Sequence, residues 1–533
     1  MEEFLVACAN SNIERIQQFL IDPTIDINSS MIEDTTPFFI SCCFGQTEAV
    51  KLLLNDKRVN VNKSKGEDIT PFLVACCFKF TEIVKLLLND ERVDVNQSTS
   101  RGGTPLTISC QEGHTEIVEI LINNPRVDVS KPESSYRLSP LYIACQFGHI
   151  EVMKLLINDV NVNQVENELG ASPFYAACWN GKIEAVKLLL NDKRVDLNKI
   201  RDKDDTTPFF VACQQGHSEI VKLLLNDERI DVNSRNKDGK TAFYNACSNG
   251  HTEVVELLLN NKRIETMEIN HGGEEDHFTR CFFIACYNGH IGVAKLLIND
   301  ERVDVNQADP FNGTPFYIAC QEGKFEIVKL LLSNSRVDVN KEGYVFDETG
   351  FFAACESGMV EVVKLLLKDD RIDINKRERE FERTPFMIAC ENNHIEVVKL
   401  LLISEKIPEE EIQEGYKIVQ RSCRPFHFNF VSEEDYLIAI EALKMKYSSL
   451  EKILRGYQVD EEQTKFLIKK DLGILAENSR DIFCLIVLLS DNYLKLPSNA
   501  NSSSSSSSNS NSNSKSQLNQ KRKRKRAKKF GRK

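Results

Sequence analysis

Cysteine is the residue type whose number and spacing in this chain could support chemistry. The 533 residues include 17 cysteines, and twelve of them recur with a period of about 35 residues. Evenly spaced thiols could form a metal-binding or redox array. The twelve positions are Cys8, Cys42, Cys76, Cys110, Cys145, Cys178, Cys213, Cys247, Cys286, Cys320, Cys355 and Cys390.

The spacing of these cysteines favours a packing role. Stacked helices lie roughly 8–10 Å apart, whereas the Cα atoms of a disulfide lie within about 7 Å. A zinc site needs four converging ligands, and the chain contains no Cys-x-x-Cys. We therefore predict that the twelve cysteines fill one small apolar packing position, with no metal site. In the vicinal pairs Cys42-Cys43 and Cys76-Cys77 we expect one buried and one outward thiol.

Histidine gives little support for catalysis. Six of the nine histidines share one repeated turn: His114, His149, His217, His251, His290 and His394. His271 and His277 flank Glu274, Glu275 and Asp276 in the longest insertion, where either a metal site or a solvated loop fits, and we favour the loop. The chain also lacks metalloprotease, phosphate-loop, dinucleotide-binding and nucleophile-elbow motifs. We predict no enzyme, no catalytic residue and no cofactor.

A repeated block of residues must position these side chains. Residues 70–76 form one copy, in which a Thr N-cap and a proline at the first helical position start a helix. A second, amphipathic helix follows over residues 81–88, with Glu82 and Lys85 paired on its outer face. Residues 92–96 then alternate like a short strand and lead into a polar turn.

This unit resembles the ankyrin repeat. A Thr-Pro-Leu-x-x-Ala helix, a Gly-His turn, a Val-x-Leu-Leu-Leu helix and an Asp-Val-Asn finger are typical of that family, and the resemblance covers residues 1–404. It implies an all-α fold, a solenoid of about twelve helix pairs with short β-hairpin fingers. The family's histidine inside the first helix is aromatic in most copies here, which favours apolar stacking between repeats. The family's second small alanine is cysteine throughout.

The end units of such a solenoid need polar or covered outer faces, because each unit buries its apolar face only on its neighbours. The first copy lacks the Thr-Pro and carries polar residues that suit an N-terminal cap. These are Glu2, Glu3, Glu14, Arg15, Gln17 and Gln18. We expect the residues after the repeats to cover the other end.

Partner binding is expected where the copies differ from one another. These positions are the two residues after each repeat cysteine and the finger tips, which line a concave partner-binding groove in ankyrin repeats. The resemblance implies partner contacts at Phe44, Phe78, Phe147, Trp179, Asn180, Gln214, Tyr287 and Asn288, and in the fingers at Tyr136, Arg137, Phe311, Tyr344 and Phe346. Trp179 and Tyr287 are the best anchor candidates, because Trp and Tyr are frequent at hot spots. Alternatively, each of these two rings packs on its neighbouring finger.

The chain leaves the repeat after residue 404. Residues 405–496 carry helical patterns, and one of them is apolar all round at Ile482–Leu489, so it must be buried. Either this small helical region caps the last repeats, which we favour, or it docks another chain. Residues 497–516 are rich in Ser and Asn, which indicates a disordered linker.

Residues 517–533 form a basic tail. Its cluster consists of Lys521, Arg522, Lys523, Arg524, Lys525, Arg526, Lys528 and Lys529. Such a run is typical of a nuclear-import signal bound by an import receptor, or of weak, non-specific contact with nucleic acid such as RNA or with anionic lipid. Because residues 515–533 hold 11 Lys or Arg and no acid, the net charge of −12 becomes −23 on residues 1–514. So acidic a body should repel nucleic acid.

The sequence therefore predicts a monomeric, non-enzymatic scaffold that binds a protein partner in its groove. The first residues are acidic where a signal peptide is basic, and the longest apolar run falls far short of the ~20 residues of a membrane span. We expect reduced thiols and a location in the cytoplasm, the nucleus or both. One alternative is a substrate-recognition adaptor whose C-terminal helices recruit an enzyme. Another is a nuclear regulator that uses the basic tail.

Overall fold

A computed structural model shows how the repeats are built. It describes residues 2–30, 35–66, 68–129, 138–158, 160–164, 170–264, 267–270, 273–309, 313–343, 347–404, 406–408, 410–412 and 414–415. The chain divides into two units, Met1–Ala439 and Ile440–Lys533, and all described residues belong to the first.

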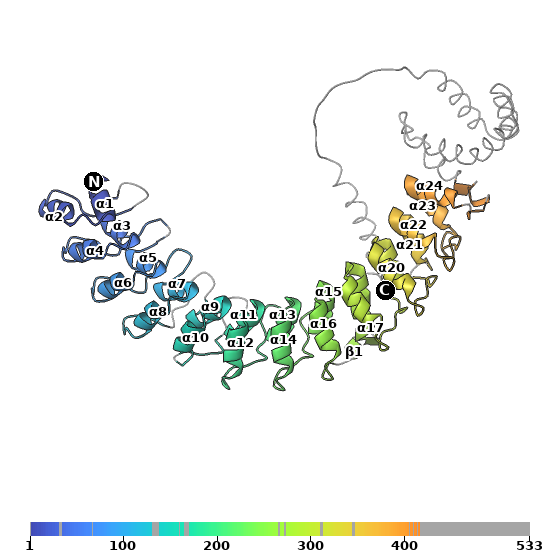
Figure 1. The fold of residues 1–533 in the computed structure, drawn as a ribbon, viewed down its shortest axis with the longest axis horizontal. Helices are drawn as coiled ribbons and strands as arrows, with labels where there is room; N and C mark the ends of the chain where they lie inside the picture. Colours follow the sequence, from blue (N-terminus) through green and yellow to red (C-terminus); the bar gives the residue numbers. More distant parts are fainter. Residues whose placement is uncertain are drawn as a thin grey trace, which may run out of the picture. The chain divides into compact units, whose positions relative to one another are not determined.

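Twelve helix pairs follow one another along the described residues (Figure 1). The first helices are α1 (Glu2–Ala9), α3 (Pro37–Cys43), α5 (Pro71–Cys77), α7 (Pro105–Glu112), α9 (Pro140–Phe147), α11 (Pro173–Trp179), α13 (Pro208–Gln214), α15 (Ala242–Asn249), α17 (His277–Asn288), α19 (Pro315–Gln321), α21 (Gly350–Ser357) and α23 (Pro385–Glu391). The second helices are α2 (Ile13–Ile21), α4 (Thr47–Leu54), α6 (Thr81–Leu88), α8 (Thr115–Ile122), α10 (Ile150–Leu156), α12 (Ile183–Leu190), α14 (Ser218–Leu225), α16 (Thr252–Leu259), α18 (Ile291–Leu297), α20 (Phe325–Ser333), α22 (Val360–Leu366) and α24 (Ile395–Ile403). Each helix contacts its pair mate and the matching helix of the next pair, which confirms the predicted all-α repeat stack.

The first helix of a pair begins as the sequence predicts. In α5, Thr70 has extended backbone and its Oγ1 accepts a hydrogen bond of 3.1 Å from the N–H of Leu73. Pro71 follows at the first helical position, where its missing N–H leaves no hydrogen bond unmade. Replacing such a Thr N-cap by alanine costs about 1 kcal/mol.

The repeat cysteines lie in one continuous core that runs through all the pairs. All twelve have a relative exposure of 0–9%. Burial raises the pKa of the Cys8 and Cys390 thiols to about 12, so both remain protonated at neutral pH. The predicted packing role is confirmed. In the vicinal pairs, Cys42 and Cys76 are buried while Cys43 and Cys77 are partly exposed, as expected.

The prediction of short strands at residues 92–96 and at the matching positions of the other repeats is wrong. The backbone there forms turns, although Val93 and Val95 are buried and Asp94 is exposed. Asp94 accepts a hydrogen bond of 3.0 Å from the N–H of Asn96, which closes an Asx turn. The alternating sequence therefore reflects burial of every second side chain. The backbone does not form the hydrogen bonds to a neighbouring strand that a β-strand requires.

Only fragments of the predicted β-hairpin fingers are present in the described residues. Isolated antiparallel bridges close several fingers, as between Arg201 and Thr206. Within the described ranges there is one two-stranded sheet, formed by β1 (Met267–Asn270) and β2 (Gly273–Asp276), with Met267 opposite Asp276. This sheet lies in the long insertion, where a solvated loop was expected. The expectation of a loop is wrong for the backbone of residues 273–276, because these residues form a strand.

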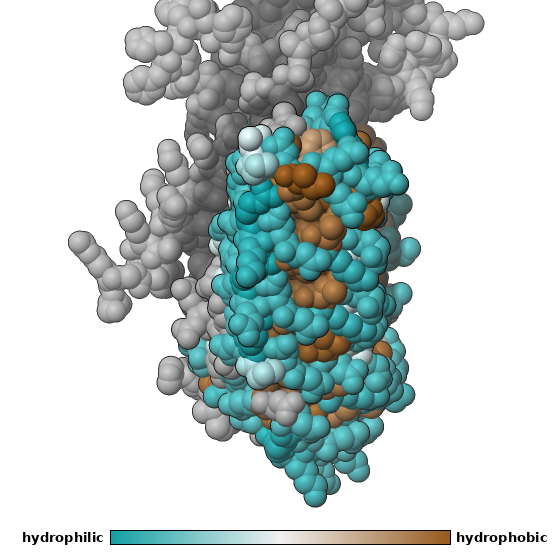
Figure 2. Space-filling model, turned by 90° about the vertical axis from the view of Figure 1, so that its left-hand side faces the viewer, coloured by the Kyte–Doolittle hydropathy of each residue, from teal (hydrophilic) through white to brown (hydrophobic). Residues whose placement is uncertain are grey.

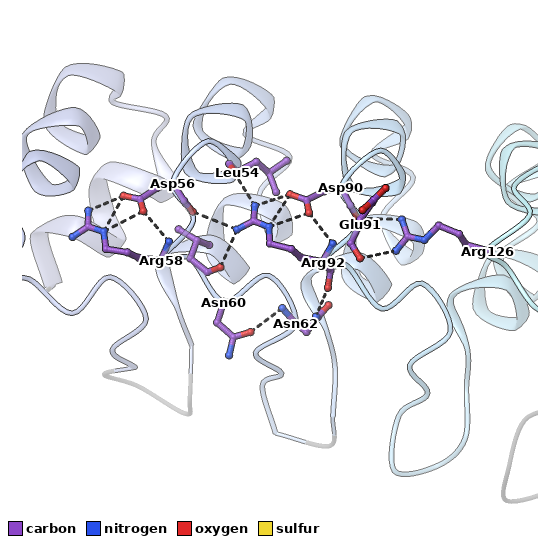
Figure 3. A network of polar contacts seen from close by, with 10 residues as sticks. Leu54, Asp56, Arg58, Asn60, Asn62, Asp90, Glu91, Arg92 and Arg126 are labelled. Atoms are coloured by element: carbon purple, nitrogen blue, oxygen red, sulfur yellow. Dashed lines mark hydrogen bonds and ion pairs between the residues drawn. The ribbon is translucent and has the colours of Figure 1, made fainter.

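An asparagine ladder ties fingers to their neighbours at most of the described joints (Figure 3). Asn62 donates its amide to the carbonyl oxygen of Arg92 at 2.7 Å and accepts from the N–H of Asp94 at 2.8 Å. The same double bond recurs along the stack, as at Asn198 with Arg229 and Asp231. Each such asparagine replaces backbone pairing that the turn conformation does not supply.

Arginines between pairs adopt two arrangements, and the residue two positions earlier selects between them. After aspartate, the guanidinium binds that carboxylate and one or more carbonyl oxygens of the preceding repeat. Arg229 binds Asp227 and the Leu190 oxygen at 2.8 Å. Arg92 binds Asp90 and also donates to the oxygens of Leu54, Asp56 and Val59. After asparagine, the guanidinium binds only the preceding repeat. Arg126 donates to the carbonyl oxygens of Leu88 at 3.0 Å, Asp90 at 3.1 Å, Glu91 at 3.4 Å and Val93. Arg263 and Arg336, which follow Asn261 and Asn334, repeat this second arrangement.

The two ends of the described stack differ. At the N-terminal end, the predicted polar cap is exposed, and Arg15 binds Glu3 at 2.6 Å. At the other end, Asn375 donates to the Lys406 oxygen at 3.1 Å, but its own Oδ1 has no partner among the described residues. The expected donor is the N–H two residues after Lys406, and Pro408 has none. The ladder therefore stops at this proline.

Candidate partner-binding surface

The ends of the first helices are held in register by the repeated histidine. His114 Nε2 lies 2.9 Å from the carbonyl oxygen of Cys77, and His149 Nε2 lies 2.8 Å from that of Gln111. The same contact recurs at His217, His251, His290 and His394. Each ring thus satisfies a carbonyl that the end of the preceding first helix leaves unpaired.

Glycine at the turn before the histidine leaves room for the next ring. Gly113 has a φ of +71°, and a Cβ at this position would lie 2.5 Å from Nδ1 of His149. Both the left-handed backbone and the close approach exclude a side chain. The register of the helix ends is therefore fixed by the glycine and the histidine together.

Phenylalanine side chains project from this frame at three of the predicted partner positions. Phe44, Phe78 and Phe147 are 59%, 55% and 43% exposed and follow the repeat cysteines of α3, α5 and α9. Phe78 lies 6.2 Å from the Phe80 ring, and Phe147 stacks at 6.2 Å on the ring of His149. An exposed phenylalanine on an ordered frame offers a large apolar contact area without loss of much side-chain entropy on binding.

Trp179 is half-buried because it packs on the following finger, the alternative that the sequence left open. Its ring stacks on Tyr175 at 6.0 Å, and the guanidinium of Arg201 lies 5.4 Å from the Trp179 ring and 5.3 Å from the Tyr175 ring. Asp204 holds Arg201 through an Nε–Oδ1 hydrogen bond of 2.9 Å. The tyrosine hydroxyl lies 3.1 Å from the hydroxyl of Thr206. Trp179 is thus part of a cluster that joins α11 to its finger.

The polar candidates at the helix ends mainly form hydrogen bonds within and between the repeats. Asn180 is exposed and donates to the carbonyl oxygen of Ala176 at 2.8 Å. Asn288 donates across the repeat to the Ser248 oxygen at 2.8 Å. Gln214 is half-buried, and its backbone oxygen accepts from Asn249 at 3.0 Å.

Tyr287 is half-buried, and the remaining candidates lie outside the described residues. These are Tyr136, Arg137, Phe311, Tyr344 and Phe346 in the fingers, and the basic cluster Lys521, Arg522, Lys523, Arg524, Lys525, Arg526, Lys528 and Lys529. Two further apolar side chains are exposed and were not named as candidates, Val6 in α1 at 53% and Phe381 in a finger at 62%. Variation between fingers, one of the two signals used, covers the turn that holds Phe381, whereas neither signal reaches Val6.

The second helices present a different surface (Figure 2). On the side where Figure 1 places α2, α4, α6 and α8, an apolar band runs between polar side chains. Leucines and isoleucines of these helices, such as Leu52, Leu54 and Ile120, are partly buried against the core. Lys51 pairs with Glu48 at 2.7 Å, which confirms the predicted paired charges on the outer face.

Metal-ligating clusters and membrane-spanning helices are the other features relevant to function. Among the described residues, no three His, Cys, Asp or Glu side chains are grouped so that they could hold a metal ion. In the same part of the chain, no helix has the length and apolar character needed to cross a bilayer.

Comparison with known proteins identifies the repeats. A family model described as ankyrin repeats in three copies matches residues 4–99, 57–132, 73–166, 127–201, 174–270, 271–343 and 336–414. The overlapping matches span the described helix pairs from α1 to α24. A comparison with curated proteins finds no match.

Proposed function

The chain belongs to the ankyrin-repeat family, and from this premise we propose that it is a non-enzymatic scaffold that binds its protein partner at the ends of the first helices. Ankyrin repeats indicate a protein–protein interaction domain. The finer assignment concerns the helix-end surface, defined as Phe44, Phe78, Phe147 and Trp179 with the adjoining fingers. The exposure of the three phenylalanines carries this assignment.

Burial of these rings by a partner would release substantial free energy. An aromatic side chain buries about 150–250 Å² when it is fully covered, and apolar burial contributes about 25 cal/mol per Å². Phe44 and Phe78 are each more than half exposed and lie on neighbouring repeats, so a single partner surface can cover both rings. At Phe78, the contact between His114 and the Cys77 oxygen keeps the end of α5 in place before binding, which lowers the entropy lost on association.

A double substitution tests this surface. The variant carries Phe44→Ala and Phe78→Ala in the full chain, and the matched control carries Phe325→Ala, at the start of the second helix α20. Partners captured by the wild-type chain are identified, and each is then titrated against the three purified proteins. We expect the double variant to bind about 10–100-fold more weakly, since each hot-spot ring contributes at least about 1 kcal/mol.

An unchanged affinity in a normally folded double variant would refute the assignment, and so would an equal loss in the control. Trp179→Ala is a less clean test, because it also removes one of the two rings that Arg201 contacts. The phenylalanine pair should therefore be tested first.

Lack of enzymatic activity is supported by the state of the repeat thiols. The reactive form of cysteine is the thiolate, and burial raises the pKa of Cys8 and Cys390 to about 12. Burial raises the pKa of further thiols of the row, such as Cys213 and Cys355, well above its ordinary value. None of these four groups is a nucleophile at neutral pH.

The basic tail supports a second, separable function, import into the nucleus. The support is the sequence observation that residues 515–533 hold 11 Lys or Arg and no acid. A fluorescent fusion of the full chain should enter the nucleus, and deletion of residues 517–533 should leave it in the cytoplasm. An unchanged distribution after the deletion would reject the import signal without affecting the helix-end proposal.

A further inference from the structure

A thiol outside the repeated cysteine position lies at the joint between the eighth and ninth helix pairs. Cys281 precedes the repeat cysteine Cys286 by five residues, the position that proline occupies in most first helices. It lies inside α17, which begins at His277 and is longer than the other first helices. Cys281 and Cys247, the repeat cysteine of the preceding α15, are both 0% exposed.

A glycine elsewhere in the stack shows what a Cβ at this position meets. Gly350 is the corresponding residue of α21, and a Cβ built on it would lie 3.2 Å from Sγ of Cys320 in the preceding repeat. Beyond the last helix pair, a Cβ on Gly415 would likewise lie 3.2 Å from Sγ of Cys390. A side chain at the proline position therefore points toward the preceding thiol, and the starting distance before either group shifts is 3.2 Å.

That distance is close to the one a disulfide needs. With an S–S bond of about 2.0 Å, the Cβ of one cysteine lies about 3 Å from the sulfur of the other. Cys281 has a real Cβ at this position, and α15 packs on α17 as α19 packs on α21. The rings of Phe243 and Phe278, one on each of these helices, lie 5.1 Å apart edge to face, which keeps the two helices close.

The other cysteines of the row lack such a partner. Successive repeat cysteines occupy the same position on stacked helices, which lie roughly 8–10 Å apart, so their Cα atoms are too far apart for a bond. Cys43 and Cys77 likewise occupy matching positions on successive helices, α3 and α5. Among the described cysteines, Cys281 alone lies at the proline position.

We propose that Cys247 and Cys281 form a redox-dependent disulfide that fastens the eighth helix pair to the ninth. With hydrogen peroxide as the oxidant, the thiolate of one cysteine attacks a peroxide oxygen, breaks the O–O bond and yields a sulfenic acid and water. The second thiolate then attacks the sulfenic sulfur and displaces hydroxide, which takes up the proton released by the second thiol and leaves as water. Two thiols and one peroxide thus give one disulfide and two waters.

Burial determines when the bond forms. Both thiols are inaccessible in the closed joint, so the first oxidation requires α15 and α17 to separate transiently. When the joint closes again, the packing returns the second thiol to the oxidised sulfur. The bond then holds α15 and α17 together beside the insertion that carries β1 and β2. After oxidation by peroxide, α15 and α17 are expected to separate less often.

Peptide mapping of the full chain tests the proposal. Wild-type protein is treated with hydrogen peroxide, without urea and at urea concentrations below its unfolding transition, which promote opening of the joint. Remaining thiols are alkylated and the digest is analysed without reductant. We expect one dominant cross-linked peptide pair, Cys247 with Cys281, and faster formation with urea. Cys281→Ser should remove it, and the control Cys320→Ser should leave it.

A second readout does not depend on any variant. Hydrogen exchange of wild-type protein should slow in α15 and α17 after oxidation and return to its original rate after reduction. The proposal is overturned if Cys247 and Cys281 are recovered as alkylated thiols under both conditions. It is also overturned if Cys247 is linked mainly to a cysteine other than Cys281.

Discussion

Arg126 should stabilise its repeat joint more than Arg229, which follows an aspartate, stabilises its own. Its guanidinium donates to four carbonyl oxygens of the preceding repeat, whereas Arg229 donates to one carbonyl and to its own Asp227. Arg126→Ala therefore removes four contacts across the joint. Arg229→Ala removes one, together with an exposed ion pair.

The expected magnitudes follow from these counts. A hydrogen bond contributes about 1 kcal/mol net, and the 3.4 Å contact with the Glu91 oxygen counts for less. Arg126→Ala should cost about 3 kcal/mol. Arg229→Ala should cost about 1 kcal/mol, because exposed ion pairs contribute about 0–1 kcal/mol. A difference of about 2 kcal/mol corresponds to roughly 30-fold in the equilibrium for opening the joint.

Native-state hydrogen exchange is the suitable assay, because long repeat arrays do not unfold in a single step. Protection of the amides in α6 and α8 is compared between wild type and Arg126→Ala, and that in α12 and α14 between wild type and Arg229→Ala. A third variant, Asn124→Asp, supplies the carboxylate that selects the other arrangement. It should reproduce part of the loss seen with Arg126→Ala, because the guanidinium is drawn back to its own repeat.

Two results would refute this reasoning. One is an equal loss of protection in Arg126→Ala and Arg229→Ala, which would mean that the carbonyl contacts do not hold the joint. The other is an Asn124→Asp variant as well protected as wild type, which would mean that the residue two positions earlier does not select the arrangement.

Three further predictions concern the turns and the charges. Gly113→Ala should destabilise the chain by about 1–3 kcal/mol, measured by urea denaturation, because of its positive φ and the His149 ring; full stability would refute the steric argument. Thr70→Ala should cost about 1 kcal/mol, while Thr70→Ser should be nearly neutral, since a serine hydroxyl caps the helix as well. The hydrogen bond from Arg92 lowers the pKa of Asp90 against the opposing effect of burial, so its contribution is present above the unfolded-state pKa of about 3.9 and is lost as the pH falls through the lower folded-state value. When hydrogen exchange is measured at a series of acidic pH values, Asp90→Asn should lose less protection than wild type over this pH range. An unchanged dependence of protection on pH would contradict the assignment.

The repeated architecture could be predicted because each of its parts has a local cause. Thr70 and Pro71 start a helix by capping and by ring geometry, whatever surrounds them. The buried cysteines were recognised because a small apolar residue recurring at one position is a packing signal. The exposed phenylalanines at Phe44 and Phe78 were found for the converse reason, since they occupy a position that varies between copies.

The conformation of the fingers could not be predicted in this way. Alternating side chains at Val93, Asp94 and Val95 report which residues are buried, and a turn stabilised by Asp94 satisfies that pattern as well as a strand does. The packing of Trp179 on Arg201 was also left open, because it depends on where the following finger returns to the helix.

The sequence by itself determined the period, the two helices of each unit, the buried position of the cysteines and the charge difference between body and tail. Only the tertiary structure decided which groups meet between units. Arg126 and Arg229 are the same residue type at the same position, yet they bind different partners because a neighbouring asparagine or aspartate changes the competition for the guanidinium. Cys281 is one more cysteine in the sequence, but the stacking of α17 on α15 brings its helix against the helix that carries Cys247. Contacts between residues about 35 positions apart depend on how rigid units stack, and that geometry is not encoded in any local pattern.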